Sequence, residues 1–278
     1  MANLCGSSRK VEMRDKESQE LDYTDKSIAS FGEISHVFNM RNLTRLTLSH
    51  NKIKVVPAGI ADLASLEILT LWNNHIEELP PSISSMANLR ILNIGMNRLY
   101  NLPRGFGAFP ALEILDLTYN NLSEKSLSGN FFMMESLRAL YLGDNDFEII
   151  PADIKNFKNL QILVFRDNDL IYLPKEVGEL SRLRELHVQN NRLTVLPPEL
   201  GSIDWVSTRH VLKLEGNPWV PPIQDQLVLG LSHLVDYIRS ETYKYLYGRH
   251  MGGGASPPPK SQDKSKKISR LQDNRAGC

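Results

Sequence analysis

Hydrophobic residues recur along this chain in one fixed frame, L-x-x-L-x-L-x-x-N-x-L, with mostly polar residues between them. The first copy of the frame consists of Leu43, Leu46, Leu48, Asn51 and Ile53. Six full copies follow, and an eighth keeps the later leucines and the asparagine but has Arg209 in place of the first leucine. The asparagines of the frame lie 23 to 26 residues apart and are Asn51, Asn74, Asn97, Asn120, Asn145, Asn168, Asn191 and Asn217. One structural unit therefore repeats through most of the chain.

The L-x-L part of each copy predicts a short β-strand, because successive side chains of a strand point to opposite faces. Parallel stacking of such strands, about 4.8 Å apart, would bury the leucines in one continuous core and turn the intervening residues outward. The asparagine follows the strand where the backbone turns, and its amide can satisfy polar groups of that turn. We therefore predict an α/β leucine-rich-repeat solenoid with a curved parallel sheet on its concave face and an irregular or short helical convex face.

An apolar residue followed by proline comes after the turn in six of the copies, as in Val56-Pro57. Proline has a fixed φ and no N–H to donate, so it suits an irregular or helix-starting segment. Later apolar positions are expected to close the convex side of each coil: Ile60, Ile83, Phe106, Ile154, Val177 and Leu200. The fourth copy lacks the proline and carries two extra residues near 122–127, so we expect a local bulge there.

Five segments follow from this frame. Residues 1–20 form a variable N-terminal segment, 21–42 an N-terminal cap, 43–220 the repeats, 221–250 a C-terminal capping helix, and 251–278 a disordered basic tail. Caps are expected because terminal repeats would otherwise expose their leucines. The helix is predicted from apolar residues at helical spacing, such as Ile223, Leu227 and Leu234. Its tyrosines leave open the alternative that it binds a partner instead of capping the array. The tail could touch acidic surfaces or a nuclear import receptor, but its composition favours a solvated linker.

Composition limits the cellular compartments and the classes of partner that are expected for this chain. Lys plus Arg and Asp plus Glu each number 32, so no net charge favours a nucleic acid or an anionic membrane. The only cysteines are Cys5 and Cys278, whereas extracellular repeat arrays of this kind usually carry disulfide-bonded caps. No apolar run is long enough for a secretion signal or a membrane span. We therefore expect a cytoplasmic monomer that binds no nucleic acid and does not insert into membranes.

No sequence motif points to catalysis. The seven histidines show no ligand spacing on a helix, and no cysteine lies near them to act as a nucleophile. The segment Arg104-Gly105-Phe106-Gly107 falls short of a phosphate-binding glycine loop. We therefore expect no cofactor, no metal site and no enzymatic activity.

The outward positions of the predicted strands hold the candidate binding residues. They are Trp72, Met96, Asp116, Tyr119, Tyr141, Asp144, Arg166 and Asp167. Exposed aromatic side chains near an arginine are typical of protein-binding hot spots, and a large indole has no reason to face water otherwise. The alternative is that a solenoid sheet simply carries mixed surface residues. A further row, Ile68, Ile91, Ile114 and Ile162, is expected to support the edge of the sheet.

Beyond the frame, several stretches resemble the Ras suppressor protein family, which consists of adaptors of cell-matrix adhesions. They include LPRGFG at 102–107, LDLTYNNLSE at 115–124, NRLTVLPPELG at 191–201, IRSETYKYLYGRHM at 238–251 and DKSKKISR at 263–270. The similarity runs from about residue 21 to residue 270, and the first 20 residues do not match. The stretch at 238–251 is the most specific, because the repeat frame alone does not require it.

The resemblance implies an adaptor that binds the last LIM domain of the PINCH protein. Through PINCH it would join integrin-linked kinase and parvin at cell-matrix adhesions and would dampen Ras-driven growth signalling. The alternative is a scaffold for a Ras-family GTPase and a phosphatase, as other 23-residue intracellular repeat proteins provide. That alternative has little support, because Lys10-Val11-Glu12-Met13 ends in Met where a phosphatase-docking segment would need Phe or Trp.

Overall fold

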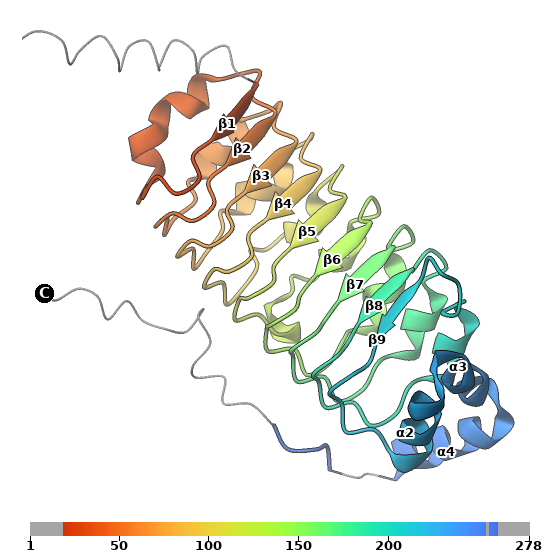
Figure 1. The fold of residues 1–278 in the computed structure, drawn as a ribbon. Helices are drawn as coiled ribbons and strands as arrows, with labels where there is room; N and C mark the ends of the chain where they lie inside the picture. Colours follow the sequence, from red (N-terminus) through yellow and green to blue (C-terminus); the bar gives the residue numbers. More distant parts are fainter. Residues whose placement is uncertain (1–18, 254–255, 261–278) are drawn as a thin grey trace, which may run out of the picture.

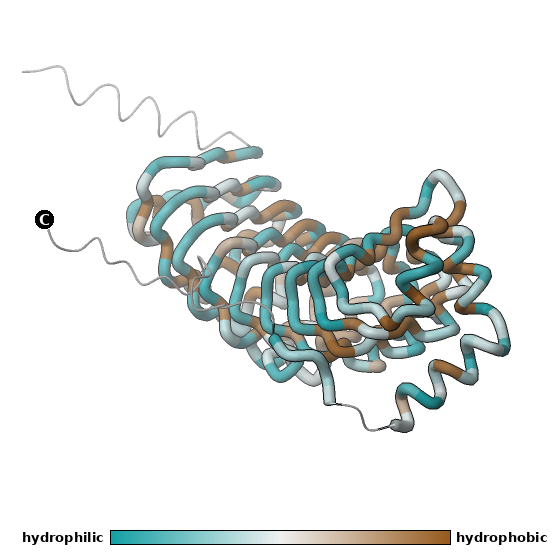
Figure 2. The backbone as a smooth tube through the Cα atoms, turned by 60° about the horizontal axis from the view of Figure 1, so that its bottom comes forward, coloured by the Kyte–Doolittle hydropathy of each residue, from teal (hydrophilic) through white to brown (hydrophobic). Residues whose placement is uncertain are grey.

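The computed structural model describes residues 19–253 and 256–260 of the 278-residue chain. Most of the predicted N-terminal segment and of the predicted tail lies outside these ranges. The described residues form an elongated array of stacked coils, with the sheet on one side and short helices on the opposite side (Figure 1). Along the tube in Figure 2, hydrophobic segments recur in each coil and stack on those of the next coil. The array is therefore the predicted solenoid.

The sheet has nine parallel strands in chain order. They are β1 (Glu20–Asp22), β2 (Arg45–Thr47), β3 (Ile68–Thr70), β4 (Ile91–Asn93), β5 (Ile114–Asp116), β6 (Ala139–Tyr141), β7 (Ile162–Val164), β8 (Glu185–His187) and β9 (Val211–Lys213). Equivalent positions of the frame pair with one another, as in Leu46 with Leu69 and Leu69 with Leu92. The register keeps every central leucine on the core side, and Leu46, Leu69 and Leu92 are fully buried.

Short 3-10 helices line the side opposite the sheet. They are η1 (Phe31–Asn39), η2 (Ala58–Asp62), η3 (Pro81–Ser85), η4 (Phe106–Ala108), η5 (Glu124–Ser126), η6 (Phe131–Met133), η7 (Ala152–Asn156), η8 (Lys175–Glu179) and η9 (Pro198–Ser202). Prolines stand at the N-caps of five of them, η2, η3, η7, η8 and η9, as their fixed φ predicts. The predicted convex positions, such as Ile60 and Val177, are fully buried.

The fourth coil departs from the others, as the extra residues at 122–127 predicted. It carries two short helices, η5 and η6, in place of one. The hydroxyl of Ser126 donates to the carbonyl of Tyr100 at 2.6 Å and ties the longer coil to its neighbour. The strands before and after it keep their pairing, with Leu115 opposite Leu140. The insertion is therefore absorbed away from the sheet, and the sheet itself does not bulge.

The frame asparagines form a ladder of buried hydrogen bonds along the array. Asn74 shows the pattern: its amide nitrogen donates to the carbonyls of Leu48 and Leu71 at 2.9 and 3.1 Å. Its amide oxygen accepts from the N–H of Ile53 at 3.0 Å. Each asparagine thus satisfies its own turn and the preceding coil, which is the structural role predicted for the set from Asn51 to Asn217.

The C-terminal cap consists of three helices, whereas the sequence predicted one. They are α2 (Pro221–Leu229), α3 (Leu231–Arg239) and α4 (Glu241–Gly252). The chain breaks first at Gly230, whose φ of 123° is not helical. It breaks again at Ser240, whose hydroxyl accepts from the N–H of Tyr243 and caps α4. Apolar periodicity continued through both breaks, so it could not reveal them.

The cap helices close the last coil by packing on its convex helix. Leu234 and Ile238 of α3 are fully buried, and α3 lies against η9. At the other end, β1 extends the sheet and η1 buries Phe31 and Val37. No helix among residues 19–253 and 256–260 has the length and apolar character needed to cross a bilayer.

Candidate protein-binding face

The sheet side of the array, here called the sheet face, presents the residues between the buried leucines. The last outward residue of each coil has a left-handed backbone, with φ between 54° and 56° in His50, Asn73, Met96, Tyr119, Asp144, Asp167 and Asn190. Such angles are uncommon outside glycine and are held here by the ladder turn that follows. Four of the predicted binding residues, Met96, Tyr119, Asp144 and Asp167, therefore occupy equivalent places at one edge of the sheet face.

The indole of Trp72 extends over the next coil because that coil has glycine at the equivalent position. A Cβ atom at Gly95 would overlap the six-membered ring of Trp72. The indole then meets the ring of Tyr119 edge to face, with 6.2 Å between ring centroids and planes at 85°. This is a favourable aromatic geometry, and it leaves Trp72 half-buried before any partner binds.

A second glycine allows Arg166 to approach the same tyrosine from the other side. A Cβ at Gly143 would lie 3.0 Å from Cγ of Arg166, so only a residue without a side chain fits easily below the arginine. The guanidinium lies over the ring of Tyr119, 5.3 Å from its centroid, and donates to the Tyr119 hydroxyl at 3.3 Å. Arg166 also pairs with Asp167 at 2.6 Å.

Trp72, Tyr119 and Arg166, from three alternate coils, thus form one continuous group, here called the aromatic–arginine cluster. Burial acts to lower the pKa of Arg166, but hydrogen bonds to Tyr119 and Asp167 outweigh it and the net pKa is raised. The guanidinium is therefore charged at any physiological pH. The cluster offers flat apolar surface beside a fixed positive charge.

Asp116 and Tyr141 form a second group beside the cluster, on the paired strands β5 and β6. The carboxylate of Asp116 accepts from the N–H of Thr118 at 2.9 Å. Burial raises the pKa of Asp116 above its ordinary value despite this hydrogen bond. Burial, followed by the charges of Glu185 and Asp116, likewise raises the pKa of Tyr141. A basic group from a partner would relieve the poorly solvated carboxylate.

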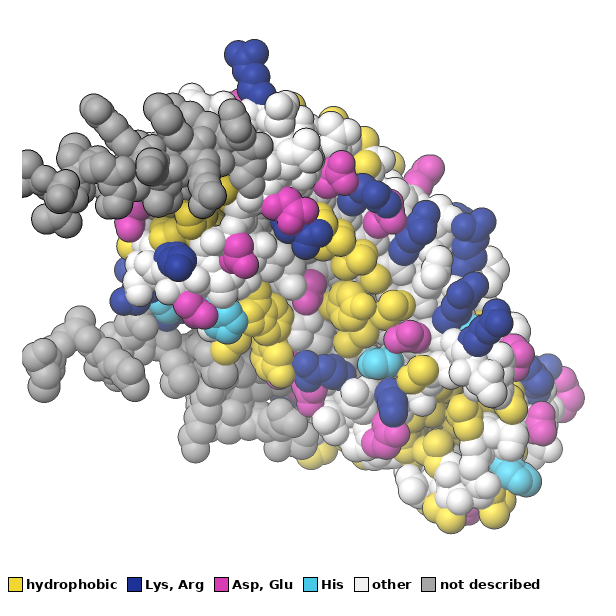
Figure 3. Space-filling view, turned by 45° about the horizontal axis from the view of Figure 1, so that its top comes forward, with side chains coloured by type: hydrophobic (Ala, Val, Ile, Leu, Met, Phe, Trp, Pro, Cys, Tyr) yellow, Lys and Arg dark blue, Asp and Glu magenta, His cyan; other side chains and the backbone are white. Residues whose placement is uncertain are grey.

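Direct contacts therefore join Trp72, Tyr119, Arg166 and Asp167 among the eight predicted binding residues. Asp116 and Tyr141 are neighbours by strand pairing, while Met96 and Asp144 extend the row along the edge and are half-buried. The surface in Figure 3 carries hydrophobic patches broken by acidic and basic side chains. Such a mixture suits a protein partner better than a small apolar ligand.

The structure shows one further property of a row predicted from sequence and one feature that the sequence did not predict. The isoleucine row at 68, 91, 114 and 162, expected only to support the sheet edge, is half-buried and adds apolar surface to the face. A charged ladder also crosses three coils, in which Glu113 pairs with Arg90 at 2.7 Å and with Arg138 at 3.5 Å. The second position of the frame holds all three ladder residues, so this row could have been found by comparing charges at that position.

No group of three histidine, cysteine, aspartate or glutamate residues within the described part of the chain is arranged to hold a metal ion.

The comparisons with known proteins agree with this architecture. A family model for a leucine-rich repeat region matches residues 20–126, and a leucine-rich-repeat model matches residues 182–203. Among solved structures, a leucine-rich-repeat protein of Leptospira interrogans superposes with a TM-score of 0.59 at 30% identity, over 77% of this chain and 58% of that one. The leucine-rich-repeat ectodomain of a membrane receptor kinase from Arabidopsis thaliana gives a TM-score of 0.62 at 30% identity, over 72% of this chain and 24% of that one.

Curated relatives are more similar still. Ras suppressor protein 1 of Homo sapiens is 69% identical over 259 residues, which cover 93% of this chain and 94% of that protein. The protein of the same name from Mus musculus is 64% identical over the same shares of both chains. The match thus extends through the repeats and the C-terminal helices, and the chain belongs to the Ras suppressor protein 1 family of leucine-rich-repeat proteins.

Proposed function

We propose that this protein is a non-catalytic adaptor whose sheet face binds the last LIM domain of a PINCH-type protein. Through that partner it joins integrin-linked kinase and parvin at cell-matrix adhesions and dampens Ras-driven signalling. The repeat array and the family support a protein-interaction role in general. The observation that carries the proposal is the aromatic–arginine cluster, which is already assembled in the free protein.

Preassembly matters because ordering a long side chain on binding costs about 0.5–1.5 kcal/mol. Trp72 and Arg166 are held in place by Tyr119 and by the glycines beneath them, so this loss of entropy occurs on folding instead. Tryptophan, tyrosine and arginine are also the residue types that dominate binding hot spots. The cluster is therefore a rigid anchor for a small folded module such as a LIM domain.

Charge supports a partner with basic groups around an apolar centre. Asp116, Asp144 and Asp167 lie close to the cluster along three coils, and the carboxylate of Asp116 is poorly solvated. A lysine or arginine placed against Asp116 would restore the stabilisation that burial removes. An acidic partner would be repelled by the same row, so the face selects by charge as well as by shape.

The test is calorimetric titration of a PINCH C-terminal LIM fragment into variants of the full-length protein. Trp72→Ala and Arg166→Ala should each weaken binding by about 2 kcal/mol, or roughly thirtyfold, because each removes an anchor of the cluster. The matched control is Lys155→Ala with Lys158→Ala, two exposed changes on and next to the convex helix η7. The control pair should bind like the wild type.

Gly95→Ala provides a sharper variant, because it keeps every binding side chain and mainly displaces the indole of Trp72, while its Cβ also comes within 3.2 Å of the Thr118 carbonyl. We expect weaker binding with a thermal midpoint close to that of the wild type. The pair Asp116→Ala with Tyr141→Ala should also weaken binding by tenfold or more, on the order of 1.4 kcal/mol. If all these variants bind like the wild type, or weaken only in proportion to unfolding, the sheet face is not the binding site.

A further inference from the structure

A short stretch of the tail lies against one flank of the repeats. Residues 256–260, Ser-Pro-Pro-Pro-Lys, leave the C-terminal helices and run back beside the coils (Figures 1 and 2). The sequence predicted no fixed structure from residue 251 onward. The described residues of this stretch nevertheless contact repeats that precede them by 60 to more than 100 positions.

Three polar contacts hold the stretch. Arg192 is 93% buried, with 7% of its surface exposed, and its Nε donates to the carbonyl of Pro258 at 2.6 Å. Lys260 pairs with Glu148 at 2.7 Å and lies 3.9 Å from the carboxylate of Asp169, whose side chain is only 5% exposed. The hydrogen bond that Lys260 donates to the Glu148 carboxylate, more than any other influence, raises the pKa of Lys260. The flank thus supplies one donor for a backbone carbonyl and two carboxylates for a cation.

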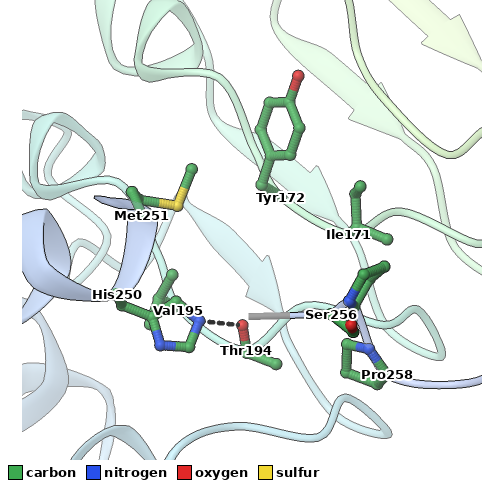
Figure 4. Close-up of a pocket in the computed structure, with 9 residues that line it drawn as sticks. Ile171, Tyr172, Thr194, Val195, His250, Met251, Ser256 and Pro258 are labelled. Carbon is green, nitrogen blue, oxygen red and sulfur yellow. Dashed lines mark hydrogen bonds between the residues drawn. The ribbon is translucent and has the colours of Figure 1, made fainter. Parts of the chain in front are cut away.

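An apolar cavity lies between these repeats, α4 and the tail stretch. It measures about 250 Å³, and its lining includes Tyr172, Thr194, His250 and Met251, and Ser256 and Pro258 of the tail. In Figure 4, His250 and Met251 stand on one side of it and Ser256 and Pro258 on the opposite side. His250 is fixed by a 2.9 Å hydrogen bond to Thr194.

The backbone of the stretch is restricted by its own sequence. Pro257, Pro258 and Pro259 have φ near −65°, and Ser256, Pro257 and Pro258 each precede a proline and so favour extended geometry. An extended proline run has few conformations to lose, and its carbonyls remain available to donors. Aromatic-lined grooves that bind such runs use this property, and here Tyr172 lines the same cavity as the tail prolines.

We propose that this flank, here called the tail groove (Glu148, Asp169, Tyr172 and Arg192), is a binding site for extended proline-rich peptides that end in lysine, and that residues 256–260 occupy it in cis. Arg192 donates a hydrogen bond to the carbonyl of a proline, and Glu148 and Asp169 bind the lysine ammonium two residues later. The groove lies on the flank where the coils leave the sheet, so it is a second interaction surface besides the sheet face. A partner with a similar segment must displace the tail.

The test uses a fluorescent peptide with the sequence of residues 254–262, GASPPPKSQ, and full-length protein in a polarisation assay. A chain carrying Pro257→Gly, Pro258→Gly and Lys260→Ala keeps the groove but loses its own ligand, and its tail offers no charge to either form of the groove. We expect this chain to bind the peptide at least about tenfold more tightly than the wild type, in which the tethered segment competes at high effective concentration.

Charge reversal then identifies the groove. Adding Glu148→Lys to the tail variant should abolish peptide binding, and a peptide with glutamate in place of its lysine should restore it. Glu135→Lys, an exposed acidic position at the end of the preceding coil, serves as the matched control and should leave binding unchanged. Thermal melts check that each variant is folded. The proposal is overturned if the tail variant does not bind the peptide, if it binds no better than the wild type, or if Glu148→Lys has no effect.

Discussion

Replacing Asn145 by alanine removes the central rung of the asparagine ladder. Asn145 is fully buried, and its amide nitrogen donates to the carbonyls of Leu117, Leu142 and Gly143 at 3.0, 3.2 and 3.1 Å. Its amide oxygen accepts from the N–H of Leu122 at 3.0 Å. These bonds join the irregular fourth coil to the fifth. Among the seven complete copies of the frame, the spacing between Asn120 and Asn145 is the longest.

The substitution does not affect the four backbone groups that bond the Asn145 amide equally. The three carbonyls each keep another donor: the Asn120 amide for Leu117, the Asn168 amide for Leu142 and the Tyr119 N–H for Gly143. The N–H of Leu122 loses its acceptor in a buried place, which costs about 1–3 kcal/mol. With about 1 kcal/mol more for the weakened carbonyls, the free energy of unfolding should fall by roughly 2–4 kcal/mol.

Guanidinium unfolding followed by circular dichroism measures this loss, and Asn217→Ala is the matched comparison. Asn217 makes equivalent bonds to Leu193, Leu214 and Val188, but it is only half-buried at the end of the array. Water can replace part of its amide, so its loss should be about 1 kcal/mol or less. Equal losses for the two variants, or a loss below about 0.5 kcal/mol for Asn145→Ala, would refute burial as the reason the ladder stabilises the fold.

Three further substitutions have defined outcomes. Asp116→Asn should raise the thermal midpoint at pH 7 and weaken LIM-fragment binding. Burial raises the pKa of Asp116, so its charged form destabilises the fold above that pKa. The amide oxygen of asparagine can still accept the hydrogen bond from the N–H of Thr118. The gain should vanish below about pH 4, where both folded and unfolded forms are protonated. Tyr243→Phe should lower unfolding free energy by about 2–4 kcal/mol, because the buried hydroxyl bonds both the N–H and the carbonyl of Leu196. Gly107→Ala should yield little folded protein in a melt, because its Cβ would overlap the backbone of the next coil.

The outward position of the candidate binding residues could be predicted from sequence because strand periodicity is reliable over repeated units. Position in the frame showed that Trp72, Tyr119 and Arg166 face outward. It did not show that they touch, because each contact spans two coils and depends on the glycine of the coil between. Gly95 and Gly143 looked like ordinary variation in a surface row, and only the stacked coils show that they make room for larger side chains.

The solenoid, its parallel register, its convex apolar positions and the ladder could all be predicted from the repeat frame. These features depend on contacts between neighbouring copies of one frame, and each copy has the same residue types at the contacting positions. The break of the capping segment into three helices became visible only in the folded chain, because Gly230 and Ser240 interrupt the helix within a continuous apolar pattern. The tertiary structure also decided the place of residues 256–260, because the partners of Lys260 and Pro258 lie in distant coils. Contacts outside the repeat have no period, so they cannot be predicted from the pattern of a single sequence.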